Sequence, residues 1–272
     1  MEADITKRLT KSEKRIHDFI ETSTDEFLFM TIGQASDTLK ISEATISRYA
    51  RHMGYQDFKE LKSAVLKKKS GRGAARKLAG TLMKDQGFHM ENWLDFQKKC
   101  LEKTWEHLDM EAFLQGKEAL RNAGRILIHG KNASAALGEL LFFRLRRLGL
   151  PVMQIPSGGS EVLEGLVHAS KGDLVIFFAF SKISREAKVI LDYARTTGCR
   201  TLAFTGRTYI PPEERADINL YVYRGEEDEY HSMTSAAAMI DGLVIALTED
   251  LGQLGTERLI CLQKLKKQYQ EK

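Results

Sequence analysis

From residue 125 onward, the sequence alternates short β-rich runs with amphipathic helical stretches. Strands joined by helices of this length run parallel, and right-handed crossovers place the helices on both faces of the sheet. The run 174–178 (Leu-Val-Ile-Phe-Phe) is apolar without alternation, which is typical of a central strand buried on both faces. We therefore predict a doubly wound α/β domain with a parallel five-stranded sheet. The expected strands are 125–129, 151–155, 173–180, 200–205 and 218–223, and the expected helices are 134–148, 160–170, 184–197 and 232–250.

The first half of the sequence favours helices. All four prolines lie after residue 150, so no proline interrupts a helix before that point. Apolar residues recur there at helical spacing, and the expected helices are 12–22, 31–39, 42–53 and one through 58–66, with further helices between 74 and 122. The basic and glycine-containing stretch 67–73 predicts a linker or hinge. The expected domains are an all-α domain at 1–78, a helical connector at 79–108 and the α/β domain at 109–272.

The net charge of +4 is concentrated at one end of the chain. Residues 1–80 hold 16 Lys and Arg against 11 Asp and Glu, whereas the remainder is close to neutral. Such a basic block is typical of a module that binds a polyanion, although a solvated helical face has the same composition.

The composition also excludes several classes of protein. No apolar run is long enough to cross a bilayer, and the polar N-terminus has no hydrophobic signal region. Three widely spaced cysteines predict neither a disulfide framework nor a metal clamp. We expect a cytoplasmic protein without a membrane partner, and no motif indicates a metal site or a cofactor.

Residues 31–55 have the pattern of a helix, a tight turn and a second helix. Lys40 and Ile41 form the expected turn, Ile41 fills the angle between the helices, and Ser42 is a suitable N-cap. Short polar and basic side chains lie on the outer face of the second helix, where a DNA major groove can accept them. The alternative is a generic helical bundle with a charged, solvated face. The candidate DNA-binding residues are Lys40, Ser42, Thr45, Ser47, Arg48 and Arg51, with Lys59 and Lys62 as further phosphate contacts.

These residues carry a resemblance to a known family. Ser12-Glu13, the stretch Ile41-Ser42-x-Ala44-Thr45-Ile46-x-Arg48-Tyr49, and the stretch from Met53-Gly54-Tyr55 to Lys62 resemble the N-terminal domain of RpiR-family (MurR/RpiR) bacterial transcription regulators. The resemblance covers about 75 residues and implies operator binding to double-stranded DNA. Because paired heads read paired half-sites, a homodimer or homotetramer is expected.

Two strand ends in the α/β domain carry hydroxyl side chains that lead into helices. The first contains Gly130, Lys131, Asn132 and Ser134, and the second contains Ser181, Lys182 and Ser184. Helix N-termini at the carboxyl ends of parallel strands bind anions. Neither loop has the glycine pattern of a dinucleotide site, so the loops favour a phosphorylated small molecule. The alternative is that the serines are ordinary helix caps.

Residues 120–250 resemble a SIS (sugar isomerase) domain, which implies that these loops bind a phosphorylated sugar or amino sugar. SIS domains usually have G-x-G-x-S in the first loop and S-x-S-G-x-T in the second. Gly130, Ser134 and Ser181 match, and Ser184 stands in for the threonine. Asn132 replaces a glycine, and at the second loop Ala179 and Lys182 replace a serine and a glycine, so we expect an altered pocket. Asp217, which resembles a later SIS landmark, is interpreted as structural.

The sequence therefore predicts a transcription regulator whose SIS domain senses a phosphorylated sugar and changes operator binding. The alternative is a sugar-phosphate isomerase with an accessory helical domain, for which Glu229 and His231 are the only candidate catalytic pair. The run 226–229 is more simply interpreted as a solvated acidic loop. A third possibility is a regulator with an empty pocket that responds to a protein partner.

Overall fold

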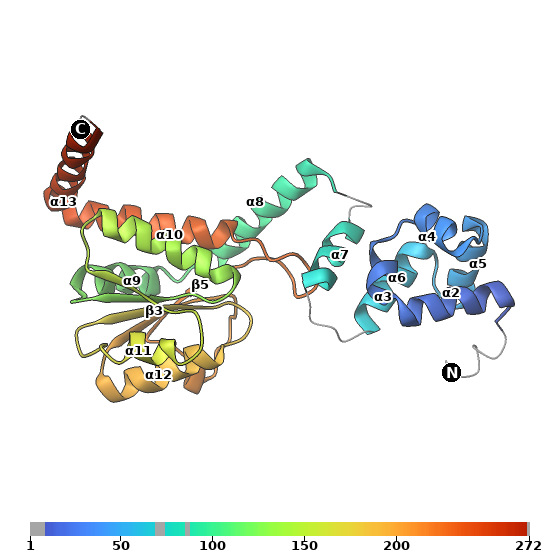
Figure 1. Ribbon diagram of the computed structural model, residues 1–272, viewed down its shortest axis with the longest axis horizontal. Helices are drawn as coiled ribbons and strands as arrows, with labels where there is room; N and C mark the ends of the chain where they lie inside the picture. The colour runs from blue at the N-terminus through green and yellow to red at the C-terminus, as the bar shows by residue number, and fades with distance from the viewer. Residues whose placement is uncertain (1–8, 69–73, 85–87, 271–272) are drawn as a thin grey trace. The chain divides into compact units, whose positions relative to one another are not determined.

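The computed structural model describes residues 9–68, 74–84 and 88–270 (Figure 1). It divides into two compact units: the first contains Met1–Asp95 together with Gly225–His231, and the second contains Phe96–Arg224 and Ser232–Lys272. Residues 69–73 of the predicted linker lie outside the described residues. In the described part of the chain, no helix is both long and apolar enough to span a membrane.

The first unit is helical. Its core consists of buried apolar side chains that include Ile16, Phe27, Ile46 and Tyr49. The predicted helices are confirmed there, but the structure adds a short helix, α3, for which the sequence shows no clear periodicity. The helices are α2 (Lys11–Thr22), α3 (Thr24–Phe29), α4 (Ile32–Leu39), α5 (Glu43–His52), α6 (Phe58–Lys68) and α7 (Ala74–Lys84).

Local capping explains where the helices of the first unit begin. The Thr10 side chain accepts a hydrogen bond from the Glu13 backbone N–H, and the Glu13 carboxylate accepts one from the Thr10 backbone N–H. Thr31 and Gln34 form the same reciprocal arrangement at the start of α4. Each pair satisfies backbone donors that have no partner within the helix, and such caps contribute about 1 kcal/mol each.

The second unit has a five-stranded parallel sheet with strand order β2-β1-β3-β4-β5. Two helices, α8 (Met90–Glu106) and α9 (Met110–Asn122), precede the first strand along the chain. The strands are β1 (Ile126–His129), β2 (Val152–Ile155), β3 (Leu174–Ala179), β4 (Arg200–Thr205) and β5 (Ile218–Tyr221). The remaining helices are α10 (Ala133–Arg147), α11 (Glu161–Leu166), α12 (Arg185–Thr197) and α13 (Thr234–Gln270), with a short 3-10 turn, η2 (Pro212–Glu214).

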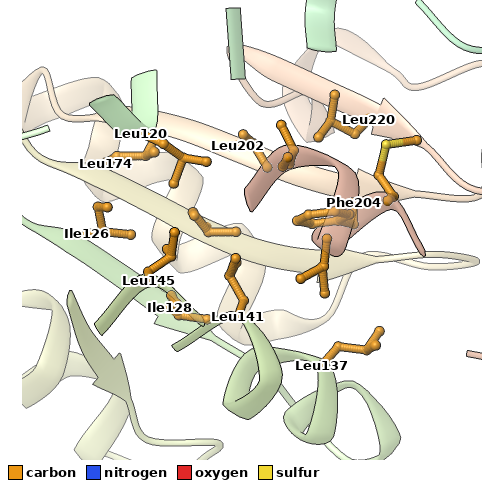
Figure 2. Close-up of a cluster of buried hydrophobic side chains, with 14 of the residues drawn as sticks. Leu120, Ile126, Ile128, Leu137, Leu141, Leu145, Leu174, Leu202, Phe204 and Leu220 are labelled. Atoms are coloured by element: carbon orange, nitrogen blue, oxygen red, sulfur yellow. The ribbon is translucent and has the colours of Figure 1, made fainter. Parts of the chain in front are cut away.

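Helices cover both faces of this sheet, which confirms the predicted doubly wound α/β fold. Helices α9, α10 and α13 pack on one face, whereas α11 and α12 pack on the other (Figure 1). Figure 2 shows the first of these cores, in which Leu141 and Leu145 of α10 lie close to Ile126 and Ile128 of β1. The sheet is therefore a rigid support for the loops at its carboxyl edge.

Two predicted helices have different lengths in the structure. The final helix was expected at 232–250, but α13 continues to Gln270. Gly252 has non-helical backbone angles (φ 52°, ψ −126°), so α13 consists of two helical segments joined at a kink, and the predicted helix corresponds to the first of them. The helix expected at 160–170 is shorter, because α11 covers only Glu161–Leu166.

Residues Gly225–His231, which we call the strap, connect β5 to α13 but pack within the first unit. The Thr81 hydroxyl accepts a hydrogen bond from the Tyr230 backbone N–H (2.7 Å), and the rings of Trp93 and Tyr230 lie 5.8 Å apart, edge to face. At Gly80, an added Cβ would collide with the Asp228 carbonyl oxygen. The strap therefore approaches α7 as closely as a backbone can.

The packing of the strap corrects one sequence interpretation. Residues 226–229 were interpreted as a solvated acidic loop, but Glu229 is buried, and its carboxylate accepts a hydrogen bond from the Glu226 backbone N–H (2.6 Å). The carboxylate is satisfied within the strap itself, which explains how an acidic side chain is buried there.

Candidate functional site

The turn between α4 and α5 has the geometry that the sequence predicts. Lys40 follows α4 in the left-handed conformation (φ 52°), which ends that helix and turns the chain. Ile41 is buried in the core. The Ser42 side chain accepts a hydrogen bond from the Thr45 backbone N–H (3.3 Å) and begins α5. The Arg15 guanidinium donates to the Leu39 carbonyl (2.7 Å), so it satisfies an orphan acceptor at the end of α4.

Helix α5 presents one face to the core and the other to solvent. Ile46, Tyr49 and Ala50 are fully buried, and the Tyr49 hydroxyl lies 2.9 Å from Nδ1 of His17. Burial raises the pKa of Tyr49, so this phenol stays neutral. The outer face holds the predicted DNA-binding residues: Lys40, Ser42, Arg48 and Arg51 are exposed, and Thr45 and Ser47 are half-buried.

One contact preorganises this outer face. The Arg48 guanidinium donates a hydrogen bond to the Thr45 hydroxyl (3.1 Å), which lies one turn earlier on α5. The Ser42 and Thr45 hydroxyls are themselves 2.9 Å apart. A guanidinium held near a helix N-terminus can bind the bidentate acceptors of guanine or a phosphate. The arrangement is therefore chemically suited to entering a DNA major groove.

One residue expected to contact DNA phosphate has another role. Lys62, proposed from the sequence as a phosphate contact, is buried, and its ammonium donates to the Met30 carbonyl (2.8 Å) at the end of α3. The prediction that Lys62 contacts DNA phosphate is therefore wrong, and the same burial lowers the pKa of its ammonium to about 8. His52 is exposed at the end of α5, and its Nδ1 lies 2.9 Å from the Glu13 carboxylate.

The first predicted ligand loop lies between β1 and α10. An added Cβ at Gly130 would lie 2.7 Å from the Ser134 carbonyl oxygen and 2.8 Å from the Ala135 Cα, so glycine is needed for this close approach. Asn132 has φ 54° and ψ −131°, and its side chain makes no capping hydrogen bond. The Ser134 hydroxyl is half-exposed and makes no hydrogen bond to any described residue, so it is available to a ligand.

The second predicted ligand loop lies between β3 and α12. The Ser184 side chain accepts a hydrogen bond from the Ala187 backbone N–H (3.1 Å), so it is a helix cap. Ser181 and Lys182 are exposed and make no hydrogen bond or ion pair within the described part of the chain. The loop therefore offers one unengaged hydroxyl, one cation and the N-terminal end of α12.

An ion pair joins the two loops. The Lys131 ammonium lies 2.6 Å from the Glu186 carboxylate in the first turn of α12. The hydrogen bond from Lys131 lowers the pKa of Glu186 to about 2. Because Glu186 neutralises Lys131, Lys182 is the cation of these two loops that stays available to an anion.

Two further polar residues, His129 and Asp217, lie at or next to the ends of strands and are not among the predicted ligand residues. His129 is buried at the end of β1, and no described residue forms a well-aligned hydrogen bond with either ring nitrogen. Burial lowers its pKa, although the backbone at Pro156 and the Glu186 charge oppose that shift. The Asp217 carboxylate accepts hydrogen bonds from the Thr201 backbone and hydroxyl, both at 2.7 Å, in agreement with the predicted structural role.

A cavity of about 450 Å³ lies at the carboxyl ends of β4 and β5 and contains none of the predicted ligand residues. Two arginines line it. The Arg207 guanidinium is paired with Glu214 at 2.7 Å, whereas the Arg215 side chain is exposed. The predicted ligand loops lie instead at the ends of β1 and β3.

The strained conformation at Asn132 leads to a stability prediction. A positive φ combined with this ψ is accessible to glycine but costs other residues on the order of 1–3 kcal/mol. We expect Asn132→Gly to raise the free energy of unfolding of the α/β domain by about 1 kcal/mol, after the greater freedom of glycine in the unfolded chain is subtracted. Urea unfolding of the two proteins measures the difference, with Ala133→Gly as a control. Equal destabilisation by both substitutions contradicts the prediction.

Two family models match the chain in the positions that this geometry indicates. The helix-turn-helix domain of the rpiR family matches residues 4–71, and the SIS domain matches residues 119–246. An uncharacterized HTH-type transcriptional regulator of Caldanaerobacter subterraneus subsp. tengcongensis is 24% identical over 221 residues, which cover 80% of this chain and 77% of the relative. An uncharacterized HTH-type transcriptional regulator of Clostridium perfringens is 20% identical over 254 residues, which cover 92% of this chain and 90% of the relative.

Solved structures agree on the fold. The sugar isomerase domain of an RpiR transcription factor from Sphaerobacter thermophilus has a TM-score of 0.59 and 22% identity, covering 64% of this chain and 97% of that domain. The Vibrio vulnificus NanR protein, complexed with ManNAc-6P, has a TM-score of 0.59 and 20% identity, covering 95% of this chain and 94% of NanR. With an rpiR-type helix-turn-helix followed by a SIS domain, the chain belongs to the RpiR family of transcriptional regulators.

Proposed function

We propose that this regulator binds an operator through α5 and that its SIS domain senses a phosphorylated sugar or amino sugar that changes operator affinity. The observation that carries the proposal is the position of the two ligand loops. Along the sheet, β1 has β2 on one side and β3 on the other, so the strand order reverses at β1 and β3. Ligands of open α/β sheets bind at this switch point, outside the carboxyl ends of the strands.

The chemistry of the loops supports an anionic ligand. Ser134 and Ser181 offer hydroxyls with no partner among the described residues, and Lys182 offers a positive charge. The N-termini of α10 and α12 add backbone N–H groups and the positive ends of their helix dipoles. A phosphate monoester is matched by this combination of groups, and its sugar hydroxyls would supply the remaining polar contacts.

The ligand of a related structure suggests which compounds to test. NanR, which matches nearly the whole of this chain in fold, was solved with ManNAc-6P. That ligand has one phosphate on a small carbohydrate, which is the class of compound that the two loops favour. ManNAc-6P therefore starts the panel for this protein, together with other hexose and pentose phosphates.

We further propose that the protein acts as a homodimer or homotetramer and not as an enzyme. A single α5 reads few base pairs, so two copies on paired half-sites give the operator specificity that one lacks. The isomerase alternative needs a base near the ligand loops. Its candidates, Glu229 and His231, lie in the strap, where the Glu229 carboxylate is buried and His231 lies 2.8 Å from the Lys77 ammonium. We expect no aldose–ketose turnover with any member of the panel.

Thermal unfolding of the intact protein with the panel tests the sensing proposal. A ligand that binds the folded state raises the melting temperature by mass action, and about 100-fold excess over Kd contributes about 2.7 kcal/mol. We expect at least one sugar phosphate to stabilise the protein, and its unphosphorylated sugar, the matched control, to have no effect. Ser134→Ala combined with Ser181→Ala should abolish that shift without lowering the melting temperature of the free protein. If no sugar phosphate stabilises the wild-type protein, the sensing proposal is wrong.

A further inference from the structure

Arg224 is a half-buried cation whose counter-ion is absent from the described part of the chain. Its guanidinium lies 3.7 Å from the centroid of the Phe180 ring and donates a hydrogen bond to the Met233 sulfur (3.4 Å). Desolvation by burial lowers the pKa of Arg224 to about 10, and no carboxylate opposes that shift. Buried charges are otherwise paired in proteins, because desolvating one without a partner is costly.

This guanidinium lies at the carboxyl edge of the sheet. Phe180 directly follows β3 and directly precedes the Ser181–Ser184 ligand loop. The Phe180 carbonyl accepts a hydrogen bond from the Gly206 backbone N–H (2.9 Å), and a Cβ at Gly206 would lie 2.9 Å from that carbonyl and 3.3 Å from the Val222 carbonyl. The ends of β3, β4 and β5 are therefore drawn together, which brings Arg224 from beyond β5 to the ring that precedes the ligand loop.

A second source of positive potential lies beside Arg224. Met233, its hydrogen-bond partner, precedes the first turn of α13, and that turn contains no acidic residue. The Ser235 hydroxyl in the same turn is buried and has no hydrogen-bond partner among the described residues. A guanidinium and a helix N-terminus repel each other unless an anion lies between them. Arginine, a free hydroxyl and helix N–H groups together are a typical phosphate-binding set.

We propose that Arg224 binds the phosphate group of the effector. The inference rests on the proposed sensing function and adds a residue that neither family-like loop supplies. The altered second loop, with Ala179 in place of a serine, has lost one hydroxyl contact, and Arg224 on the adjacent Phe180 ring supplies a stronger, charge-assisted one. The strap begins at the next residue, Gly225, so Arg224 directly precedes the segment that packs against α7.

The test compares inorganic phosphate binding by the full-length wild-type protein and by Arg224→Met, using calorimetry at ionic strength matched with chloride. Methionine keeps an unbranched apolar side chain that can pack on the Phe180 ring but removes the charge. We expect affinity for phosphate to fall by at least about 10-fold in Arg224→Met and by less in Arg224→Lys. Arg215→Met, which removes an exposed arginine from the same domain, should bind phosphate like the wild type.

Stability separates this role from a structural one. Removing an unpaired, half-buried cation should leave the melting temperature of the ligand-free protein unchanged or raised, whereas loss of a structural arginine lowers it.

The proposal is overturned if wild-type protein does not bind phosphate, if Arg224→Met binds it equally well, or if Arg224→Met destabilises the free protein. If phosphate binding depends on Arg224 but no sugar phosphate binds, the Arg224 inference stands and the proposed effector class fails. If a sugar phosphate binds Arg224→Met with wild-type affinity, the Arg224 inference fails and the proposed effector class stands.

Discussion

Replacing both Arg48 and Arg51 by alanine should weaken operator binding by at least about 100-fold, because base-specific arginine contacts contribute about 1–3 kcal/mol each and phosphate contacts add a salt-dependent term. Both side chains are exposed on α5, and Arg48 is oriented by its hydrogen bond to Thr45. Neither side chain packs in the core, so the melting temperature should change little. Fluorescence anisotropy with DNA from upstream of the protein's own gene measures the affinity.

The matched control removes the same charge from the same domain. Lys11 and Lys14 are exposed on α2, outside the turn and the outer face of α5. Their double alanine variant should lose less than about 10-fold in affinity, since only long-range attraction is reduced. The slope of log affinity against log salt should also be shallower for the Arg48/Arg51 variant than for the wild type. Equal losses in the two double variants would show that charge alone, and not α5, determines binding.

Gly80→Ala should separate ligand binding from the operator response. The new Cβ would collide with the Asp228 carbonyl in the strap, so α7 and the strap must move apart. If the strap transmits occupancy, this variant binds the sugar phosphate and the operator separately with near wild-type affinity. Typical coupling changes affinity by about 5-fold to 150-fold, and we expect the variant to reduce that change to less than about 2-fold. Operator titrations with and without ligand measure it.

Two further variants show whether a loss of coupling comes from the contact between α7 and the strap. Gly242 lies inside α13 with no atom near an added Cβ, so Gly242→Ala is a matched helical substitution that should leave coupling intact. Thr81→Val removes the acceptor of the Tyr230 N–H bond without a backbone collision, and it should weaken coupling even if Gly80→Ala folds poorly. Full ligand response in both Gly80→Ala and Thr81→Val would contradict a transmitting strap.

Local signals explain why the turn between α4 and α5 could be predicted from sequence. The Ser42 cap, the buried Ile41 and the inner face of α5 all depend on residues within one or two helical turns of one another. The sheet was predictable for a similar reason, because unbroken apolar runs such as Leu174–Ala179 indicate buried parallel strands. The capping role of Ser184 also follows from neighbouring residues.

Long-range contacts explain what the sequence did not reveal. Lys62 lies in a charged stretch of sequence, and its burial depends on the distant Met30 carbonyl together with the Phe58 ring, over which its ammonium lies. Likewise, the acidic strap has no local pattern that predicts packing against Gly80 and Thr81, which lie far earlier in the chain. Arg224 was missed because its partner, the Phe180 ring, is brought near by the order of β3, β4 and β5. The roles of such charged residues can be assigned only when the fold shows which distant residues they contact.

The most direct test of the account is the operator Kd of the intact protein, measured with and without each sugar phosphate of the panel at constant ionic strength. At least one phosphorylated sugar should change Kd by about 10-fold or more, its unphosphorylated form should not, and the Ser134→Ala/Ser181→Ala variant should no longer respond. An operator Kd that stays the same with every phosphorylated sugar, at concentrations that saturate any observed binding, would contradict it.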